Sequence, residues 1–361
     1  MNAALFTGDG RIDIRRVDRP DAPPGGGLLR VEAVGLCGTD LAQYHGRLGL
    51  PGERYPIVPG HEIVGRLVAI DAQTAARWGV AEGDRVAVDE VVRCGDCTAC
   101  RRLEPPCQAL RIHGITMPFD EEPGLWGGCA EYMVLTPRTS LHRVDPALAP
   151  EAAVLFEPLA NALHWLECVA LRPGETVVVQ GPGHQGLACM AAALAAGAGM
   201  VIATGVTSDA ERLDAARALG VQHTINVEGV RDVVGQVREL TGGRMADVII
   251  DAAAASTATI PLAVAMARSR GRIALAGFKH GRAVEDLVSD AIVLKKLTIQ
   301  GVGGSTPATI RSALDLLTAG RVPVGPLLGE VLDLDRLPLA MDLLARRVAH
   351  RDAVRVSLRI A

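Results

Sequence analysis

The pattern of apolar and polar positions along the chain changes near Pro150. Before this point the apolar runs are short, and turn segments such as PGGG, PGE and EGD separate them. Short apolar runs bounded by Gly and Pro are typical of β-strands. Residues 1–150 are therefore predicted to form a mainly-β domain, with strands in LLRVEAVGL, IVGRLVAI and DRVAVDEVV.

After Pro150 the same pattern predicts alternating helices and strands. Residues 151–171 carry apolar side chains at helical spacing. Strands are then predicted in ETVVVQ, MVIATG, HTIN, ADVIIDAA, RIALAGF and LTIQGV, and helices between them in LACMAAALAAG, DAERLDAARALG, VRDVVGQVRELTGG and STATIPLAVAMARSRG. Such alternation indicates an α/β fold, with a doubly wound parallel sheet covered by helices on both faces. This domain is expected to span residues 151–301.

A two-domain organisation also agrees with the length of 361 residues, because single cores usually stop growing at roughly 250–300 residues. The C-terminal segment, residues 302–361, has helical patterns in TPATIRSALDLLTAG and LPLAMDLLARR and a closing strand pattern in AVRVSLRI. We expect this segment to pack against the first domain and complete it.

The charge balance excludes some classes of partner. The formal net charge is −4, whereas nucleic acids and anionic membranes favour basic surfaces, so neither is expected as a partner. No apolar run approaches the roughly 20 residues of a membrane helix, and the N-terminus lacks the apolar segment of a signal peptide. The cytoplasm is therefore the expected location.

A cluster of cysteines predicts a structural metal site. Two, two and six residues separate the four cysteines, which are Cys94, Cys97, Cys100 and Cys107. Four thiolates at such spacing can close a tetrahedral zinc site that has no open position and performs no chemistry. Disulfides and free buried thiols are the alternatives, and the short spacing and cytosolic context disfavour both.

A glycine-rich loop predicts a dinucleotide site. The segment fits G-x-G-x-x-G, follows the strand ETVVVQ and opens a helix, with the residues Gly181, Pro182, Gly183, His184, Gln185 and Gly186. The first glycine allows a tight turn, the second a close approach to a pyrophosphate, and the third close packing of helix on strand.

The choice between NAD and NADP stays open. The next strand ends at Gly205, where an acid that binds the ribose hydroxyls of NAD is expected but is absent or displaced to Asp209. Without that acid, Ser208 and Arg212 could receive the 2′-phosphate of NADP. Equally, Asp209 could simply cap the following helix.

Three residues far apart in the sequence have the side chains of a catalytic zinc site. Cys37, His61 and Glu157 offer a thiolate, an imidazole and a carboxylate, which can hold Zn²⁺ and leave one position open. No local spacing links them. On the residues alone, the favoured interpretation is a buried thiol, a hydrogen-bonded core histidine and a surface charge.

The order of these motifs resembles the zinc-containing medium-chain dehydrogenase family. The chain carries Cys37-Gly-Thr-Asp40, Gly60-His-Glu62, the four-cysteine lobe, Phe156-Glu-Pro-Leu159 and the glycine loop in that order. The E-P-L version is most similar to the sorbitol and threonine dehydrogenase branch. The resemblance covers essentially the whole chain and implies a GroES-like catalytic domain, a Rossmann domain and a cleft between them.

The resemblance also implies roles for single residues. Cys37, His61 and Glu157 match the catalytic zinc ligands, and Glu62 matches a glutamate that binds zinc in relatives, directly or through water. Thr39 matches the hydroxyl residue that takes the proton of the substrate. Asp40 matches the carboxylate that orients the ligand histidine.

Two features depart from the family pattern. The lobe has six residues before its fourth cysteine, where relatives usually have seven. Ala42 stands where relatives often carry a proton-relay histidine; His45 could substitute, or the proton could leave through water.

The expected function is hydride transfer between a secondary alcohol or polyol, or its ketone, and NAD(P), with catalytic and structural zinc. A zinc-free quinone or enoyl reductase of the same scaffold and a non-catalytic zinc- and nucleotide-binding protein are the alternatives. The pocket wall is expected to include Tyr44 to Pro51, Phe119 and Trp126, although each of these fits the apolar core better than a substrate contact. By resemblance, the strand in LTIQGVGG pairs across a subunit boundary, so a homodimer or homotetramer is expected.

Overall fold

The computed structural model describes residues 1–102, 107–349 and 351–360. The chain forms two compact units, Met1–Phe156 with Leu328–Ala361, and Glu157–Leu327. The return to the first unit therefore comes at Leu328, whereas the sequence placed it at residue 302. The intervening helix α11 (Pro307–Thr318) belongs to the second unit, and just after it Arg321 donates to the carbonyl of Ala195 at 3.2 Å.

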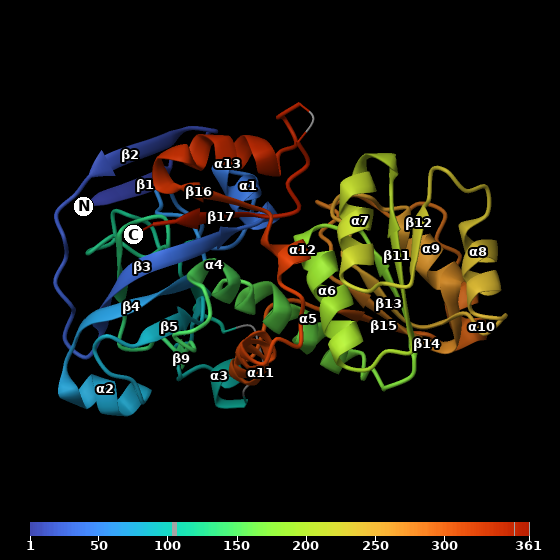
Figure 1. Cartoon of the computed structure of the whole chain (residues 1–361), viewed down its shortest axis with the longest axis horizontal. Helices are drawn as coiled ribbons and strands as arrows, with labels where there is room; N and C mark the ends of the chain where they lie inside the picture. Colours follow the sequence, from blue (N-terminus) through green and yellow to red (C-terminus); the bar gives the residue numbers. More distant parts are fainter. Residues whose placement is uncertain (103–106, 350, 361) are drawn as a thin grey trace. The chain divides into compact units, whose positions relative to one another are not determined.

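A mixed sheet forms the centre of the first unit. Its strand order among the described residues is β16-β17-β3-β4-β5-β9, and β8 also pairs with β3. The strands are β3 (Gly27–Leu36), β4 (Glu62–Ile70), β5 (Arg85–Val88), β8 (Tyr132–Leu135), β9 (Leu141–Arg143), β16 (Glu330–Asp333) and β17 (Val356–Arg359). The red C-terminal strands lie beside the blue strand β3 in Figure 1, so the end of the chain completes the sheet that its beginning starts.

Smaller elements surround this sheet. Two ribbons pair β1 (Asn2–Phe6) with β2 (Ile12–Arg16) and β6 (Val91–Val92) with β7 (Arg111–Ile112). The helices are α1 (Gly38–Tyr44), α2 (Ala72–Trp78), α3 (Thr98–Arg102), α4 (Pro150–Ala153) and α13 (Leu337–Leu344). The apolar core joins side chains of β1, β3 and β4 to Leu337 and Met341 of α13, which fixes the C-terminal segment in place.

The second unit has the predicted doubly wound parallel sheet. Its strand order among the described residues is β12-β11-β10-β13-β14-β15, and every pair is parallel. The strands are β10 (Thr176–Gln180), β11 (Met200–Gly205), β12 (His223–Asn226), β13 (Ala246–Asp251), β14 (Ala267–Leu275) and β15 (Thr298–Gly301). The order reverses between β10 and β13, which is where sheets of this kind bind dinucleotides.

Helices flank this sheet in Figure 1. They are α5 (Phe156–Cys168), α6 (His184–Ala195), α7 (Ala210–Ala218), α8 (Val233–Leu240), α9 (Thr259–Met266), α10 (Ser289–Lys295), α11 and α12 (Gly325–Leu328). Because helices cover both faces, β10 is buried along its whole length, as its apolar run predicts. Among the described residues, no helix has both the length and the apolar character needed to cross a bilayer.

Some element boundaries differ from the predictions. The helix predicted over 151–171 is two helices, because α4 ends at Ala153 and α5 begins at Phe156. The helix predicted to run to Gly271 ends at Met266, and β14 begins at the extended residue Ala267. The sequence pattern did not predict α10.

Candidate functional site

The pairing of β3 with β4 brings Cys37 and His61 together. Gly35 pairs with Glu62 at the last position of the antiparallel ladder. His61 directly precedes β4 and Cys37 directly follows β3, so both residues lie at the same end of the two strands. Gly60 adopts a φ of 88°, which favours glycine, and turns the chain into β4 at this point.

Cys37, His61 and Asp40 form a buried constellation. Cys37 Sγ lies 3.4 Å from His61 Nε2, and His61 Nδ1 lies 3.6 Å from Asp40 Oδ1. The backbone N–H groups of Cys37 and Gly60 donate to the Asp40 carboxylate at 2.8 and 3.2 Å. Since Cys37, His61 and Asp40 are at most 6% exposed, Asp40 is fixed behind the imidazole and orients Nε2 toward the thiol.

Burial and neighbouring charges shift the pKa values of this group. Burial raises the pKa of the Cys37 thiol, and the nearby His61 opposes the shift only in part. Burial also acts to raise the pKa of Asp40, but the charge of His61 and the hydrogen bonds from His61 and Cys37 together outweigh it and leave the pKa below its usual value. The carboxylate of Asp40 is therefore the stable negative charge behind His61.

The two donor atoms fit one zinc ion. With Zn–S of about 2.3 Å and Zn–N of about 2.0–2.1 Å, tetrahedral ligands lie about 3.6 Å apart, close to the observed 3.4 Å. The carboxylate behind His61 is the arrangement that fixes ligand histidines in zinc sites. The residues present therefore fit the metal.

Glu62 lies beside Cys37 but is bound to Arg355. One carboxylate oxygen of Glu62 is within 4.8 Å of Cys37 Sγ. Its Oε2 accepts from the Arg355 guanidinium, whereas its Oε1 has no hydrogen-bond partner among the described residues. Burial raises the pKa of Glu62, although Arg355 acts in the opposite direction. Arg355 lies 293 positions away, and no local sequence signal could have identified it.

Glu157 belongs to the second unit. It lies in the first turn of α5, is 7% exposed and accepts from Asn161 Nδ2 at 2.6 Å. A buried carboxylate held by an amide keeps a defined orientation. Its joint role with Cys37 and His61 is part of the proposal below.

The other residues predicted for the reaction lie on or near α1. Thr39 is half-buried, and its N–H donates to Cys37 Sγ at 3.3 Å. His45 ends α1 with its ring 4.8 Å from that of Tyr44. Trp126 is part of the apolar core of the first unit, and Phe119 packs against that core.

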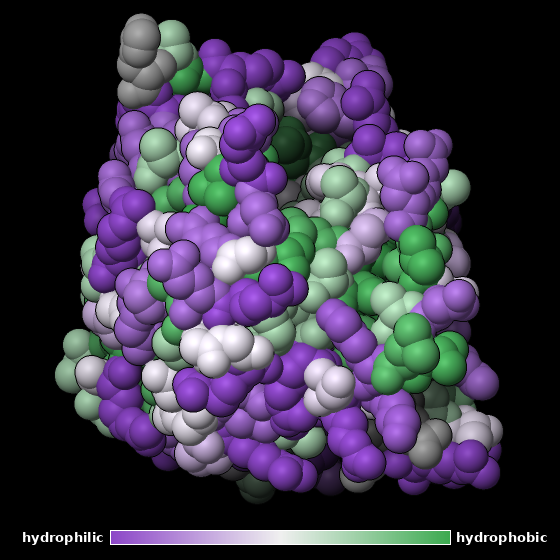
Figure 2. Space-filling view, turned by 90° about the vertical axis from the view of Figure 1, so that its right-hand side faces the viewer, coloured by the Kyte–Doolittle hydropathy of each residue, from purple (hydrophilic) through white to green (hydrophobic). Residues whose placement is uncertain are grey.

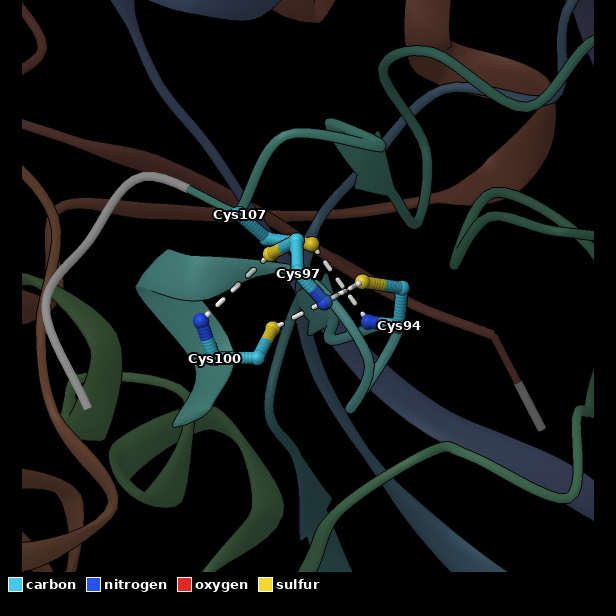
Figure 3. A group of neighbouring side chains, drawn as sticks. All are labelled: Cys94, Cys97, Cys100 and Cys107. Atoms are coloured by element: carbon cyan, nitrogen blue, oxygen red, sulfur yellow. Dashed lines mark hydrogen bonds between the residues drawn. The ribbon is translucent and has the colours of Figure 1, made fainter. Parts of the chain in front are cut away.

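The four lobe cysteines converge as predicted. Their sulfur atoms lie within 4.8 Å of one another, and those of Cys94 and Cys100 are 3.8 Å apart. Tetrahedral zinc thiolates lie about 3.8 Å apart. In Figure 3, backbone N–H groups of the lobe point at neighbouring sulfurs.

Hydrogen bonds from the backbone favour the thiolate form at Cys97. At Cys100 the backbone at Gly95 also acts to lower the pKa, but burial and the neighbouring thiols together raise it to about 11. The backbone around the lobe, chiefly at Gln108, lowers the pKa of Cys97 to about 6. The lobe therefore fits structural zinc, and all eight cysteines are free of disulfides. Most of the shortened loop, residues 103–106, lies outside the described residues.

The glycine loop joins β10 to α6 with the predicted geometry. Gly181 has a φ of 87°, and a Cβ there would meet Ala253 at 2.8 Å. A Cβ on Gly186 would lie 1.9 Å from the carbonyl of Gly181. A Cβ on Gly183 would meet only the Arg212 guanidinium, at 3.6 Å. Gly183 thus leaves space at the N-terminus of α6, where a phosphate is favoured.

The residues after β11 form a turn. Asp209 Oδ2 accepts from Val206 N at 3.0 Å, so this acid caps the turn after Gly205. Glu228 Oε2 accepts from Thr207 N at 2.8 Å and is a second acid at this position, which the sequence had not indicated. Ser208 and Arg212 also have partners within the protein.

Comparison with known proteins identifies the family. The "Zinc-binding dehydrogenase" profile matches residues 186–319, and the "Alcohol dehydrogenase GroES-like domain" profile matches residues 23–146. The chain is 40% identical over 362 residues to the "Probable alcohol dehydrogenase adh" of Mycobacterium tuberculosis, covering 98% of this chain and 96% of that protein. The chain belongs to the zinc-binding alcohol dehydrogenase family. The fold predicted from the sequence, GroES-like plus Rossmann, is confirmed.

Relatives within this family act on polyols. The erythritol/L-threitol dehydrogenase of Mycolicibacterium smegmatis is 32% identical, with 99% of this chain and 97% of the relative covered. The sorbitol dehydrogenase of Bacillus subtilis is 33% identical, with 77% and 75% covered. The predicted resemblance to this branch of the zinc-binding alcohol dehydrogenase family is confirmed.

Among solved structures of similar dehydrogenases, one is bound to NADP and another to NADH. A zinc-binding dehydrogenase of Sinorhizobium meliloti bound to NADP has a TM-score of 0.85 and 27% identity, with 99% of this chain and 98% of that chain covered. An alcohol dehydrogenase of E. coli bound to NADH has a TM-score of 0.82 and 26% identity, with 99% of each chain covered.

Proposed function

We propose that this chain oxidises a secondary alcohol or polyol to the ketone, or catalyses the reverse reduction, with NAD or NADP. The observation that carries the proposal is the buried pair of Cys37 Sγ and His61 Nε2, 3.4 Å apart, with Asp40 behind the imidazole. These donors are intact in a chain whose relatives include polyol dehydrogenases. A zinc-free reductase of this scaffold would not require a thiol and an imidazole at zinc-ligand distance with a carboxylate behind the imidazole.

Cys37, His61 and Glu157 are the proposed ligands of the catalytic zinc, and Glu62 Oε1 is the additional acceptor beside Cys37. Bound there, zinc would supply Lewis-acid chemistry, which lowers the pKa of a hydroxyl oxygen. Asp40 holds His61 in the tautomer that directs Nε2 forward. Thr39 Oγ1 is the proposed acceptor of the hydroxyl proton, and His45 or solvent receives it next.

The glycine loop is the proposed pyrophosphate site. Gly181, Pro182 and Gly183 lead the backbone past the phosphates, and the N–H groups of His184, Gln185 and Gly186 face them from α6. Gly205, Ser208 and Arg212 are proposed to surround the adenosine ribose. Bound there, the cofactor would supply the hydride-transfer chemistry, and the protein would supply position and electrostatics.

The test combines metal analysis with turnover. Purified protein is expected to contain two zinc ions per chain and to reduce NAD or NADP with secondary alcohols or polyols. Cys37→Ser is expected to lose one zinc and lower kcat at least a thousandfold, while circular dichroism stays native. Full activity without the metal would favour the zinc-free reductase and contradict the proposal.

We also propose a homo-oligomer in the cytoplasm. β15 is the edge strand of its sheet among the described residues. Large apolar side chains are exposed in the loop after β14 and in α10, namely Phe278 (77%), Val293 (72%) and Leu294 (79%). Figure 2, seen from the side on which α8 and α10 are labelled in Figure 1, shows apolar patches between polar side chains. Such patches favour a second copy of the chain. Sedimentation should show a dimer or tetramer that Leu294→Glu dissociates and the control Asp290→Asn leaves intact.

A further inference from the structure

Three arginines lie in one row across the sheet of the first unit. The register pairs Arg30 of β3 with Arg66 of β4, and Arg66 with Arg85 of β5; the three strands lie side by side in Figure 1. Residues paired in this way point to the same face, with Cβ atoms about 4.5–5.5 Å apart. Like charges at such positions repel each other, so an anion beside the row stabilises it.

Glu32 supplies such an anion at one end of the row. It is 8% exposed, and its carboxylate accepts from Arg66 Nε at 2.8 Å and from Arg85 Nε at 2.5 Å. Arg85 also donates from Nη1 to two backbone carbonyls, at 3.0 and 2.9 Å. The donors of Arg85 are therefore engaged within the protein.

The other end of the row keeps cationic groups available. Arg30 is exposed, and its guanidinium has no hydrogen bond or ion pair within the part of the chain that the structure describes. The Arg66 side chain is 34% exposed, and its Nη1 donates to the carbonyl of Gly83 at 3.1 Å. Arg66 Nη2 has no partner among these residues. Arg30 and Arg66 thus offer N–H donors to solvent on the same face of the sheet.

A pocket lies where these two arginines meet the turn before β5. Its lining residues come from β3, β4 and this turn, and they are Arg30, Arg66, Leu67, Val68, Glu82 and Gly83. β4 bulges beside the pocket: Ala69 pairs with Leu28 and Leu67 with Leu29, so Val68 has no partner on β3. The pocket volume of about 390 Å³ is within the range of small-molecule sites, roughly 300–1,000 Å³.

The chemistry of the lining favours a phosphate group. Guanidinium groups bind phosphate and carboxylate through paired N–H donors. A phosphate or its monoester has three terminal oxygens to share between two such groups, whereas a carboxylate has two. Glu82 is the acid among the lining residues, so two cations stand against one opposing charge. Leu67 and Val68 add apolar surface that the organic part of an ester can contact.

We propose that Arg30 and Arg66 form a binding site for the phosphate group of a small molecule, separate from the reaction centre. Arg66 lies five positions after His61 along the chain. Because strands rise about 3.4 Å per residue, the two residues are about 17 Å apart. A phosphate between the guanidinium groups would offset the repulsion that Glu32 leaves at this end of the row.

Calorimetric titration with inorganic phosphate tests the site. The zinc-loaded enzyme is saturated with NADH to occupy the glycine loop, and the ionic strength is held constant because salt screens exposed charges. The wild type is expected to bind phosphate with a Kd on the order of 1 mM, as for two hydrogen bonds between charged groups. Arg30→Gln should weaken binding about 10- to 100-fold, the loss of one such interaction. Arg30→Lys, which keeps the charge without the paired donors, should retain part of the affinity.

Further variants and probes decide the chemistry. Arg16→Gln is the matched control and should leave the affinity unchanged, because Arg16 is an exposed arginine of β2 that does not line the pocket. Glu82→Gln should tighten phosphate binding, since it removes the opposing charge. Glycerol phosphate that binds more tightly than inorganic phosphate assigns an organic ester, and equal or weaker binding assigns the free ion.

Three results would overturn the inference: no saturable binding by the wild type, equal affinities of Arg30→Gln and the wild type, or acetate binding as tight as that of phosphate. The inference does not rest on the proposed function. Because the comparison depends on Arg30, a protein that oxidises no alcohol would refute the proposed function and leave the phosphate site intact.

Discussion

Replacing Lys279 by Met should destabilise the second unit in a pH-dependent way. Lys279 Nζ lies 2.8 Å from Asp251 Oδ2, at the carboxyl ends of β14 and β13, and the two side chains are 12% and 0% exposed. The same ammonium also donates to the carbonyl of Ala253 and to Thr259 Oγ1. Lys279→Met therefore leaves a fully buried carboxylate without its cation.

The expected loss can be bounded in two ways. Breaking one partner of a buried ion pair costs about 3–5 kcal/mol. Alternatively Asp251 takes up a proton, which at pH 7 costs about 1.36 kcal/mol for each of about three pH units above the ordinary value of 3.8, or about 4 kcal/mol. The variant should adopt whichever of these two states of Asp251 has the lower free energy. We therefore expect the free energy of unfolding to fall by about 3–4 kcal/mol at pH 7.

The sign of the pH dependence follows from the pKa of Asp251. Burial raises this pKa even though Lys279 acts to lower it, and loss of Lys279 raises it further. The folded variant therefore binds more protons than the unfolded chain, and its stability increases as the pH falls through the folded pKa. Between pH 7 and pH 5 the variant should recover up to about 2.7 kcal/mol relative to the wild type.

Urea unfolding of both proteins at pH 7 and pH 5, followed by circular dichroism, measures these differences. Lys295→Met is the matched control, because Lys295 binds three carbonyl oxygens, which do not titrate. Its loss should be equal at both pH values. Adding Asp251→Asn to Lys279→Met should restore much of the stability. A Lys279→Met loss that is the same at pH 5 and pH 7 would refute the reasoning.

Other variants test the remaining sites. Cys97→Ser should lower zinc from two ions to one per chain, measured by elemental analysis, with alcohol turnover reduced less than by Cys37→Ser; unchanged zinc content would contradict a structural site. Gly186→Ala should destabilise the second unit by about 1–3 kcal/mol and weaken NAD(P)H binding in a fluorescence titration, because its Cβ would lie 1.9 Å from a backbone oxygen. Lys296→Gly should increase the free energy of unfolding by up to about 1 kcal/mol, because Lys296 ends α10 with a φ of 54°, which favours glycine. The increase should appear as a higher urea midpoint.

The sequence predicted an element best where a single apolar pattern lies between clear turn signals. The strand at Thr176–Gln180 is a single apolar run between turn signals, and the structure has it where expected. The helix before β14 was predicted too long, because the mostly polar segment after Met266 has no helix-breaking residue before Gly271. The helix Ser289–Lys295 was missed because its apolar residues are consecutive, from Ala291 to Leu294, rather than at helical spacing.

For the site, the sequence identified side-chain types but not their arrangement. The lobe cysteines are close in sequence, so short spacing alone was sufficient to predict that they converge. Cys37 and His61 are 24 positions apart, and only the pairing of β3 with β4 joins them.

The return of the chain to the first unit also constrains the metal site. Strand β17 pairs with β3 on the side opposite β4, so the Arg355–Glu62 ion pair crosses over β3 at Gly35. A Cβ at Gly35 would lie 2.0 Å from both side chains, so a side chain there is incompatible with the pair. While Arg355 binds Oε2, Glu62 can offer a metal only Oε1. In the proposed zinc site, Glu62 would therefore compete with substrate through Oε1 alone.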